Sequence, residues 1–396
     1  MKPKHIAIFT HMAAGHVYTF LDVCSELKRR GHRVTFPANK LFAVKINAAG
    51  IEAIKIQMPE IRLPRYLLQY ETGDDSSYWQ RLGCIGCPSS IINTLSIVRE
   101  LEEFYETNPP DGILYDWFSF AGPIFAKLLR CPAIQIGTHF AHHNSMARLD
   151  GAYVTPQPIL DFAPIIDNFM SAMGVEGSGQ IWHAEPINIF LIPREFQHDV
   201  DSYDDRFKFV GVTFNSRQNK ALRKNRTNDG KPLLLISEAS TSEDDRFMRL
   251  CVEAFGNSRY QVVFLGGVNN TEVSSVVLPN NFEFHREVSN RDILPLADVA
   301  VCQAGMGTTL ECLYHGVPVV AVPPIPFNSE VAFRISELGL GVHVSERGMT
   351  PLALKSAVDT ASMDQAIRGR VRRMRDTLRS NRGAELASDI IEQFFS

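Results

Sequence analysis

Residues 301–341 read VCQAGMGTTLECLYHGVPVVAVPPIPFNSEVAFRISELGLG. The segment opens at the end of an apolar strand, Val299 to Cys302, which runs into a turn that contains Gly305 and Gly307. A helix is expected from about Thr308. Glycine lets a ligand approach the backbone closely, and the first amide N–H groups of a helix attract phosphate oxygens. Strand, turn and helix together predict an anion-binding site.

A second strand and helix follow within the same segment. The apolar run Val317 to Val322 predicts a strand that ends at Pro323 and Pro324. A helix is expected from about Ser329 to Leu338, and Gly339 stops it. The segment is therefore expected to form a βαβα unit built around a phosphate site.

The residues AGMGTTLECLYHGVPVVAVP, followed by ELGLG, resemble the donor-binding signature of the family 1 glycosyltransferases, especially the bacterial macrolide and natural-product branch. The resemblance implies an α/β fold of the GT-B type, in which two Rossmann-like, doubly wound domains face an interdomain cleft. It also implies that Thr308 binds the diphosphate and Glu311 the nucleotide ribose. The other expected donor-binding residues are Gln303, Gly305, Met306, Gly307, Asn328, Ser329, Val288 and Ser237.

Length and composition predict two domains of similar size. The chain has 396 residues, of which 45% are hydrophobic and 21% charged, as in ordinary globular proteins. A polar, basic segment from Asn215 to Lys231 is typical of an interdomain linker. We expect an acceptor-binding domain at 1–213, the linker at 214–230, a nucleotide-sugar domain at 231–380, and a helix at 381–396 that crosses back to the first domain, as the resemblance implies.

The charge distribution argues against a nucleic-acid partner. The net charge is −4 and the signs are interspersed, so no basic patch marks a polyanion site. The run from Arg368 to Arg382 places Arg368, Arg372, Arg375, Arg379 and Arg382 on one helical face. We interpret this face as solvated rather than as a membrane or polyanion site.

Cysteine usage predicts a reduced, cytoplasmic protein without a structural metal. The seven cysteines are scattered and odd in number, the chain opens without a secretory apolar region, and no apolar run reaches the length of a membrane span. Cys84 and Cys87 lack the second ligand pair of a zinc site. Asp199 and Asp201 form an Asp-x-Asp in an acidic surface segment, which we interpret as a solvated loop. No metal and no cofactor are expected.

Two residues are expected at the carboxyl ends of neighbouring strands in the first domain. His5 to Phe9 predicts a strand, and the loop after it contains His16 in the sequence AAGHVYTF. Gly112 to Tyr115 predicts another strand, which ends on Asp116. A carboxylate there could orient the imidazole. The resemblance implies that His16 is the catalytic base and that Asp116 pairs with it; otherwise His16 would cap or pack at a helix start, and Asp116 would cap a helix.

Several aromatic and histidine residues are candidates for the acceptor-binding wall, and the segment Tyr153 to Met173 is apolar and proline-containing. This composition predicts a lipophilic acceptor. The expected acceptor-binding residues are Trp79, Phe118, His139, His142 and Met146. With the nucleotide-sugar donor, these small molecules are the expected partners of a monomer or homodimer.

The predicted activity is inverting, metal-independent transfer of a sugar from a UDP or dTDP donor to a hydroxyl of a lipophilic natural product. Three departures from the family pattern bear on it: Gln303 replaces a phosphate-binding His, Phe327-Asn328 replaces an acidic-Gln pair that holds sugar hydroxyls, and Tyr18-Thr19 replaces Asn-Pro. An apolar Phe327 at this position predicts a deoxysugar donor; the alternative is that its ring turns into the core and leaves Asn328 and Ser329 to contact the sugar. The alternatives are a catalytically silent auxiliary protein and a GT-B nucleotide-sugar epimerase.

Overall fold

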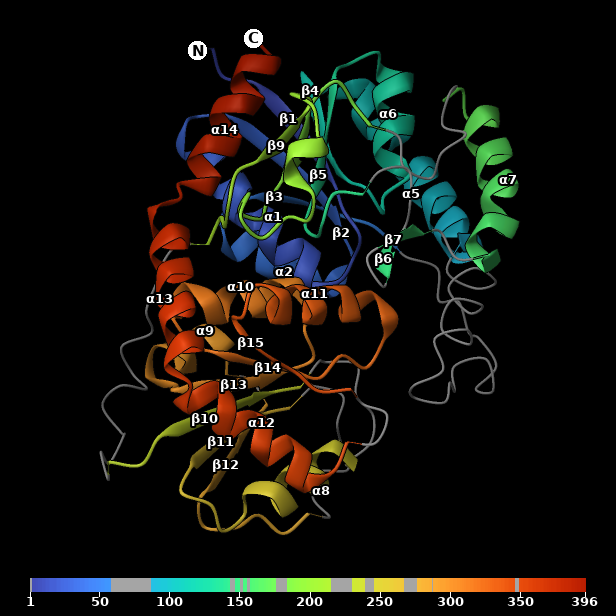
Figure 1. The fold of residues 1–396 in the computed structure, drawn as a ribbon. Helices are drawn as coiled ribbons and strands as arrows, with labels where there is room; N and C mark the ends of the chain where they lie inside the picture. Colours follow the sequence, from blue (N-terminus) through green and yellow to red (C-terminus); the bar gives the residue numbers. More distant parts are fainter. Residues whose placement is uncertain are drawn as a thin grey trace. The chain divides into compact units, whose positions relative to one another are not determined.

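The computed structural model describes residues 2–57, 87–142, 147–149, 152–154, 157–175, 184–214, 230–238, 246–266, 276–286, 288–345 and 349–396 (Figure 1). The chain divides into two compact units, Met1–Asn215 with Asn381–Ser396, and Ser216–Ser380. Each unit is a parallel sheet flanked by helices, which confirms the predicted fold class. Most of the predicted linker, 215–229, lies outside the described residues.

The first unit contains a seven-stranded sheet with the order β3-β2-β1-β4-β5-β8-β9. All its strand pairs are parallel. Helices on both faces bury the central strands, so these read as continuous apolar runs. The strands are β1 (His5–Phe9), β2 (Arg33–Ala38), β3 (Glu52–Lys55), β4 (Gly112–Asp116), β5 (Ala133–Gly137), β8 (Asn188–Phe190) and β9 (Phe207–Phe209).

Two sets of helices cover the two faces of this sheet. On one face, a core cluster joins the strands to α1 (Ala14–Arg29), α2 (Lys40–Ala48) and α14 (Gly383–Phe394). On the other face, a second cluster contains residues of α5 (Cys87–Thr107), α6 (Ala121–Leu129) and α7 (Gln157–Ala172). An antiparallel pair, β6 (Ala147–Leu149) and β7 (Ala152–Val154), and a short 3-10 helix, Val200–Ser202, complete the unit.

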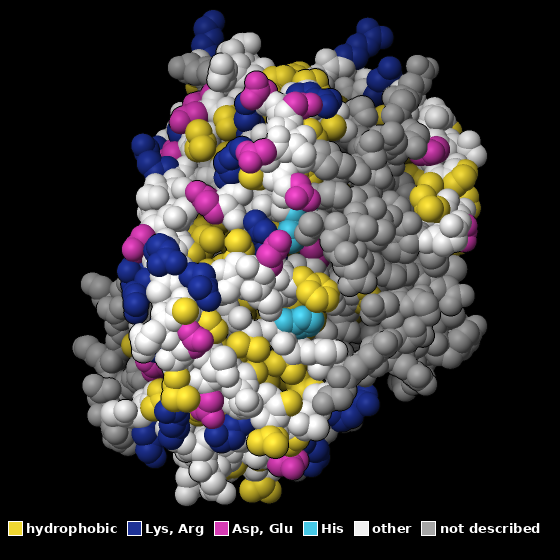
Figure 2. All heavy atoms as spheres, in the orientation of Figure 1, with side chains coloured by type: hydrophobic (Ala, Val, Ile, Leu, Met, Phe, Trp, Pro, Cys, Tyr) yellow, Lys and Arg dark blue, Asp and Glu magenta, His cyan; other side chains and the backbone are white. Residues whose placement is uncertain are grey.

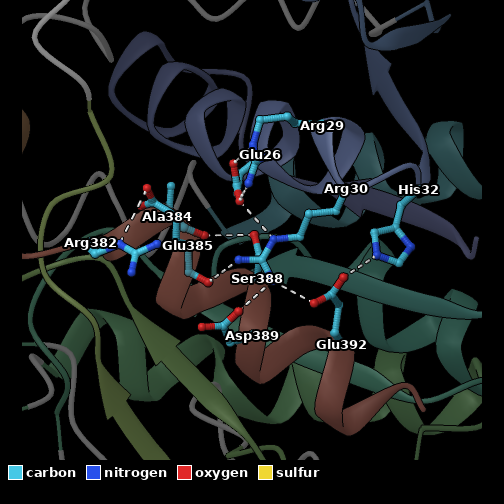
Figure 3. A network of polar contacts seen from close by, with 10 residues as sticks. All are labelled: Glu26, Arg29, Arg30, His32, Arg382, Ala384, Glu385, Ser388, Asp389 and Glu392. Atoms are coloured by element: carbon cyan, nitrogen blue, oxygen red, sulfur yellow. Dashed lines mark hydrogen bonds and ion pairs between the residues drawn. The ribbon is translucent and has the colours of Figure 1, made fainter. Parts of the chain in front are cut away.

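Helix α14 returns to the first unit and packs on α1, burying Ala387, Ile391 and Phe395 in the shared core. A polar network reinforces this contact (Figure 3). Arg30 donates to Glu26, Asp389 and Glu392 and to the carbonyl of Glu385. Its side chain is only 17% exposed, so these bonds are better shielded than those of a surface ion pair.

His32 extends the same network from the start of β2. The backbone N–H of Lys4 donates to its Nδ1. Its Nε2 lies 2.9 Å from Glu392 Oε1, a contact that Figure 3 shows. An imidazole that accepts at Nδ1 carries its hydrogen on Nε2, so His32 donates through Nε2 to the Glu392 carboxylate. The network thus links the termini of β2, α1 and α14.

The second unit contains a six-stranded parallel sheet with the order β12-β11-β10-β13-β14-β15. Its strands are β10 (Leu233–Ser237), β11 (Gln261–Leu265), β12 (Phe282–His285), β13 (Val299–Cys302), β14 (Val319–Ala321) and β15 (Gly341–His343). Its helices are α8 (Arg246–Phe255), α9 (Asn290–Ile293), α10 (Met306–His315), α11 (Pro326–Glu337), α12 (Pro351–Met363) and α13 (Gln365–Ser380), with a 3-10 turn at Leu294–Leu296.

Three helices begin earlier than the sequence pattern indicated. Helix α1 starts at Ala14, so His16 lies in its first turn rather than in the loop before it. Helix α10 starts at Met306 rather than near Thr308, so Gly307 belongs to its first turn. Helix α11 starts at Pro326 rather than near Ser329. Proline suits the first position of a helix because its missing N–H would be unpaired there in any case.

Three arginines of α13 bond to backbone carbonyls. Two of them, Arg368 and Arg379, belong to the face predicted to be solvated, on which Arg372, Arg379 and Arg382 are exposed, whereas Arg370 lies on another face of the helix. Arg368 donates to the carbonyl of Ser362, Arg370 to that of Gly339, and Arg379 to that of Tyr314. These carbonyls lie at or near the ends of α12, α11 and α10, where backbone acceptors lack helical partners. The arginines therefore cap three neighbouring helices, while Lys and Arg side chains remain visible over α13 in Figure 2.

Within the described residues, no helix is both long and apolar enough to cross a lipid bilayer.

Candidate active site

His16 and Asp116 meet at the carboxyl ends of β1 and β4, two adjacent strands of the first sheet. Asp116 is the last residue of β4, and His16 lies in the first turn of α1. The Nδ1 atom of His16 forms a hydrogen bond with Oδ2 of Asp116. Because Nδ1 is engaged, Nε2 is the ring nitrogen left for a substrate.

Asp116 is fully buried, and further groups hold its carboxylate. Thr10 donates through its hydroxyl to Oδ2 at 3.2 Å, and the backbone N–H of Phe118 donates to Oδ1 at 2.9 Å. Thr138, just after β5, places its hydroxyl 3.3 Å from Nδ1 of His16. These bonds fix the rotamer of the carboxylate and therefore the orientation of the imidazole.

The Asp116 carboxylate changes the basicity of His16. Burial lowers the pKa of His16, but the charge of Asp116 and its hydrogen bond together outweigh burial, and the pKa of His16 is raised. A raised pKa makes the imidazole a better proton acceptor. The pair has the geometry and the electrostatics of a general base and its orienting carboxylate.

His11 is a neighbour that the sequence analysis missed. Its ring lies edge-on to that of His16, with 5.4 Å between centroids, and Phe118 lies 5.7 Å from His16 and 6.0 Å from His11. Burial lowers the pKa of His11, and a charge on His16 lowers it further. His11 directly follows Thr10 at the end of β1, and that position could have identified both residues.

The structure describes three of the five residues predicted to bind the acceptor. Phe118 lies against His16, as given above. His139 is buried, and its ring stacks on that of His142 with 6.3 Å between centroids. Burial and the neighbouring histidines hold the pKa of His139 well below its usual range, so it stays neutral. Trp79 and Met146 lie outside the described residues.

The predicted anion site in the second unit lies at the start of α10. Gly305 caps this ten-residue helix in an extended conformation, while Ala304 before it has a φ of 53°. That left-handed conformation costs a non-glycine residue about 1 to 2 kcal/mol. A Cβ built at Gly305 or Gly307 would meet no atom within 4 Å. Neither packing nor a positive φ requires these glycines, so the open space beside them suits a ligand.

Thr308 and Glu311 both contact the start of α9. Asn290 donates to the Thr308 hydroxyl at 3.3 Å, and Arg291 Nε donates to Oε1 of Glu311 at 2.6 Å. Burial raises the pKa of Glu311, and Arg291 opposes this only in part. The residues predicted for diphosphate and ribose are therefore held by one short helix.

The remaining predicted donor residues surround the same loop. Asn328 donates through its side-chain amide to the carbonyl of Gln303 at 2.7 Å, which ties α11 to the end of β13. Ser237 is buried at the end of β10 and is the register partner of Cys302. Ser329 donates to the carbonyl of Ile325 within its own helix. Met306 is buried in the first turn of α10, and Val288 precedes α9.

The described side chains do not gather as metal ligands. No three His, Cys, Asp or Glu residues among them are grouped closely enough to hold an ion. Asp201, of the Asp-x-Asp pattern, is 92% exposed and pairs with Arg194 at 2.6 Å.

Comparison with known proteins places this geometry among glycosyltransferases. Residues 262–393 match the family described as "Erythromycin biosynthesis protein CIII-like, C-terminal domain". The chain is 31% identical to the NDP-glycosyltransferase YjiC of Bacillus subtilis, over 100% of this chain and 98% of that protein. It is 28% identical to the demethyllactenocin mycarosyltransferase of Streptomyces fradiae, over 99% and 87%.

The fold agrees with a solved structure of the same kind. The crystal structure of CalG4, the calicheamicin glycosyltransferase, matches with a TM-score of 0.81 and 27% identity. The match covers 100% of this chain and 98% of that one.

Proposed function

The chain belongs to the natural-product branch of the family 1 glycosyltransferases, and on that premise we propose that it transfers a sugar from a UDP or dTDP donor to a hydroxyl of a lipophilic natural product, with inversion and without a metal ion. The observation that carries the proposal is the His16–Asp116 pair at neighbouring strand ends. We expect the enzyme to act in the cytoplasm.

The proposed chemistry is a single displacement. Nε2 of His16 takes the proton of the acceptor hydroxyl as its oxygen attacks the anomeric carbon. The bond from that carbon to the diphosphate oxygen breaks, and the nucleoside diphosphate leaves from the opposite face, which inverts the configuration. Asp116 stabilises the imidazolium that forms. Its buried, doubly hydrogen-bonded carboxylate needs no rearrangement during the step.

Stabilisation of the leaving diphosphate is assigned to the start of α10. The unpaired N–H groups there, with the positive end of the helix dipole, attract negative charge. The space beside Gly305 and Gly307 gives the phosphates access to this backbone. Thr308 would bind a phosphate oxygen and Glu311 the ribose. With these groups in place, the proposal requires neither a divalent cation nor a cofactor.

Apolar side chains in the first unit support a lipophilic acceptor. Ile92 and Leu95 of α5 are each 46% exposed, and Leu160 and Ile165 of α7 are 46% and 50% exposed. Hydrophobic side chains of α7 are visible on the right of Figure 2. Helices α5 and α7 pack on each other, so these residues belong to one region of the unit. Exposed apolar side chains on two neighbouring helices can contribute to a ligand-binding surface.

The test is a two-stage assay on the whole chain. Calorimetric titration with UDP and dTDP measures donor-site binding, and product formation from a panel of their sugars with apolar hydroxyl-bearing acceptors then measures transfer. Transfer with inverted anomeric configuration supports the proposal. Binding of neither nucleotide, or a product with retained configuration, would overturn it.

A further inference from the structure

The ion pair between Arg291 and Glu311 involves the residue that we propose for the ribose. Arg291 Nε donates to Oε1 at 2.6 Å, and the two side chains are 33% and 15% exposed. The neighbouring Asn290 donates through its side-chain amide to the Thr308 hydroxyl at 3.3 Å, so both site residues are bonded from the same short helix. The Glu311 carboxylate is thus bonded from α9 before any nucleotide enters.

This prior bonding changes what Glu311 can recognise. A carboxylate that holds both hydroxyls of a ribose offers one oxygen to each. A site discriminates against a ligand that lacks a hydroxyl because the group meant for it stays buried without a partner. At Glu311, Oε1 already has a charged donor, so loss of one ribose hydroxyl leaves no such unpaired group.

We propose that Arg291 determines the nucleotide specificity of the donor site by occupying Oε1 of Glu311, so that the 2′-hydroxyl of the donor nucleotide is not required. The inference rests on the proposed function, since it assumes that Glu311 faces the ribose. It assigns 2′-deoxyribonucleoside diphosphates, the dTDP type, as donors that bind at least as well as their ribonucleotide counterparts.

The first experiment isolates the 2′-hydroxyl without any mutation. UDP and 2′-deoxy-UDP carry the same base and differ only at the 2′-hydroxyl. Calorimetric titration of the whole chain with each gives two Kd values, and their ratio measures the contribution of that hydroxyl to binding. We expect the two Kd values to agree within about twofold. Loss of one neutral hydrogen bond would instead weaken binding by roughly fivefold. Tighter binding of UDP by more than about fivefold would overturn the inference.

The second experiment removes the ion pair. In Arg291→Gln, Oε1 of Glu311 loses its charged donor. We expect the affinity for UDP to rise about fivefold relative to the affinity for 2′-deoxy-UDP. Lys355→Gln is the matched control, because it removes a positive charge that pairs with Asp359 in α12, away from α9 and α10. A folded Arg291→Gln protein with an unchanged ratio contradicts the inference.

The two levels of the proposal fail differently. If neither nucleotide binds the wild-type protein, the proposed donor site is wrong, and the inference falls with it. If both bind and UDP is strongly preferred, the donor site stands and only the role of Arg291 is wrong.

Discussion

Arg30 and Glu392 form an ion pair with 2.6 Å between Nη1 and Oε2, although 362 positions separate them in the chain. The pair belongs to the network that holds α14 against α1 (Figure 3). Glu26 is part of it, and its bonds to Arg29 and Arg30 hold the pKa of that carboxyl at about 2 despite the opposing effect of burial. The network therefore connects two segments that only the folded first unit brings together.

Substitution of Arg30 should weaken the first unit. Arg30→Ala leaves Glu26, Asp389 and Glu392 without their shared, largely buried cation, and we expect a loss of about 2 kcal/mol, seen as a lower Tm by calorimetry. Arg33→Ala is the control, since Arg33 and Glu52 are 43% and 44% exposed and such pairs contribute little. Equal Tm values for the two variants would refute the assignment.

Loss of the proposed base should abolish transfer without unfolding the protein. His16→Ala removes the proton acceptor, and we expect kcat to fall by a factor of about 10² or more. His285→Ala, which removes a partly exposed imidazole that pairs with Glu283, should keep normal turnover. Near-normal activity in a folded His16→Ala protein would rule out the mechanism.

The pH profile should show the influence of Asp116 on His16. The pKa of His16 is raised above 6.5, so kcat/KM should decline as pH falls through that raised value and the base becomes protonated. Asp116→Asn removes the charge that raises the pKa, so the acid limb should move to lower pH while the maximal rate decreases. An acid limb at the same pH in both proteins would show that another group controls the profile.

Transfer should continue without divalent cations. We expect the rate after treatment with a chelator to equal the untreated rate, because helix α10 is proposed to stabilise the diphosphate by itself. Product formation with and without added magnesium or manganese measures this. Activity that disappears with the chelator and returns with either ion is the contrary result.

Phe327 should favour a donor that lacks a sugar hydroxyl. A hydroxyl buried against a phenyl ring without a partner costs about 1 to 3 kcal/mol, so we expect higher kcat/KM with a 6-deoxy or 2,6-dideoxy sugar than with glucose on the same nucleotide. Phe327→Asp should shift the preference toward glucose. A wild type that prefers glucose, or a variant whose preference does not move, would contradict this role.

The parts of the fold that could be predicted depend on contiguous sequence. The strand, turn and helix of 299–315 are local, so the pattern located β13 and α10 to within a few residues. His16 and Asp116 could be paired because each follows a strand of a parallel sheet. The roles of the individual site residues in substrate binding stay predictions.

The missed features arise from contacts between distant segments. Nothing near Arg291 in the sequence indicates that it meets Glu311, because the pairing depends on how α9 packs on α10. The backbone bonds of three α13 arginines could not be predicted for the same reason: a helical projection shows which arginines share a face, but not which carbonyls of other helices lie beside them. Thr138 reaches His16 only because β5 pairs with β4.

The return of residues 381–396 to the first unit has a consequence for synthesis on the ribosome. Residues 216–380 form one continuous unit, which can complete its core as soon as its own chain has emerged. The first unit, although its first 215 residues are made earlier, lacks Ala387, Ile391 and Phe395 of its core until α14 is translated. The part of this core that α14 covers therefore stays uncovered throughout synthesis of the second unit, and this is the interval in which a chaperone would bind the nascent chain.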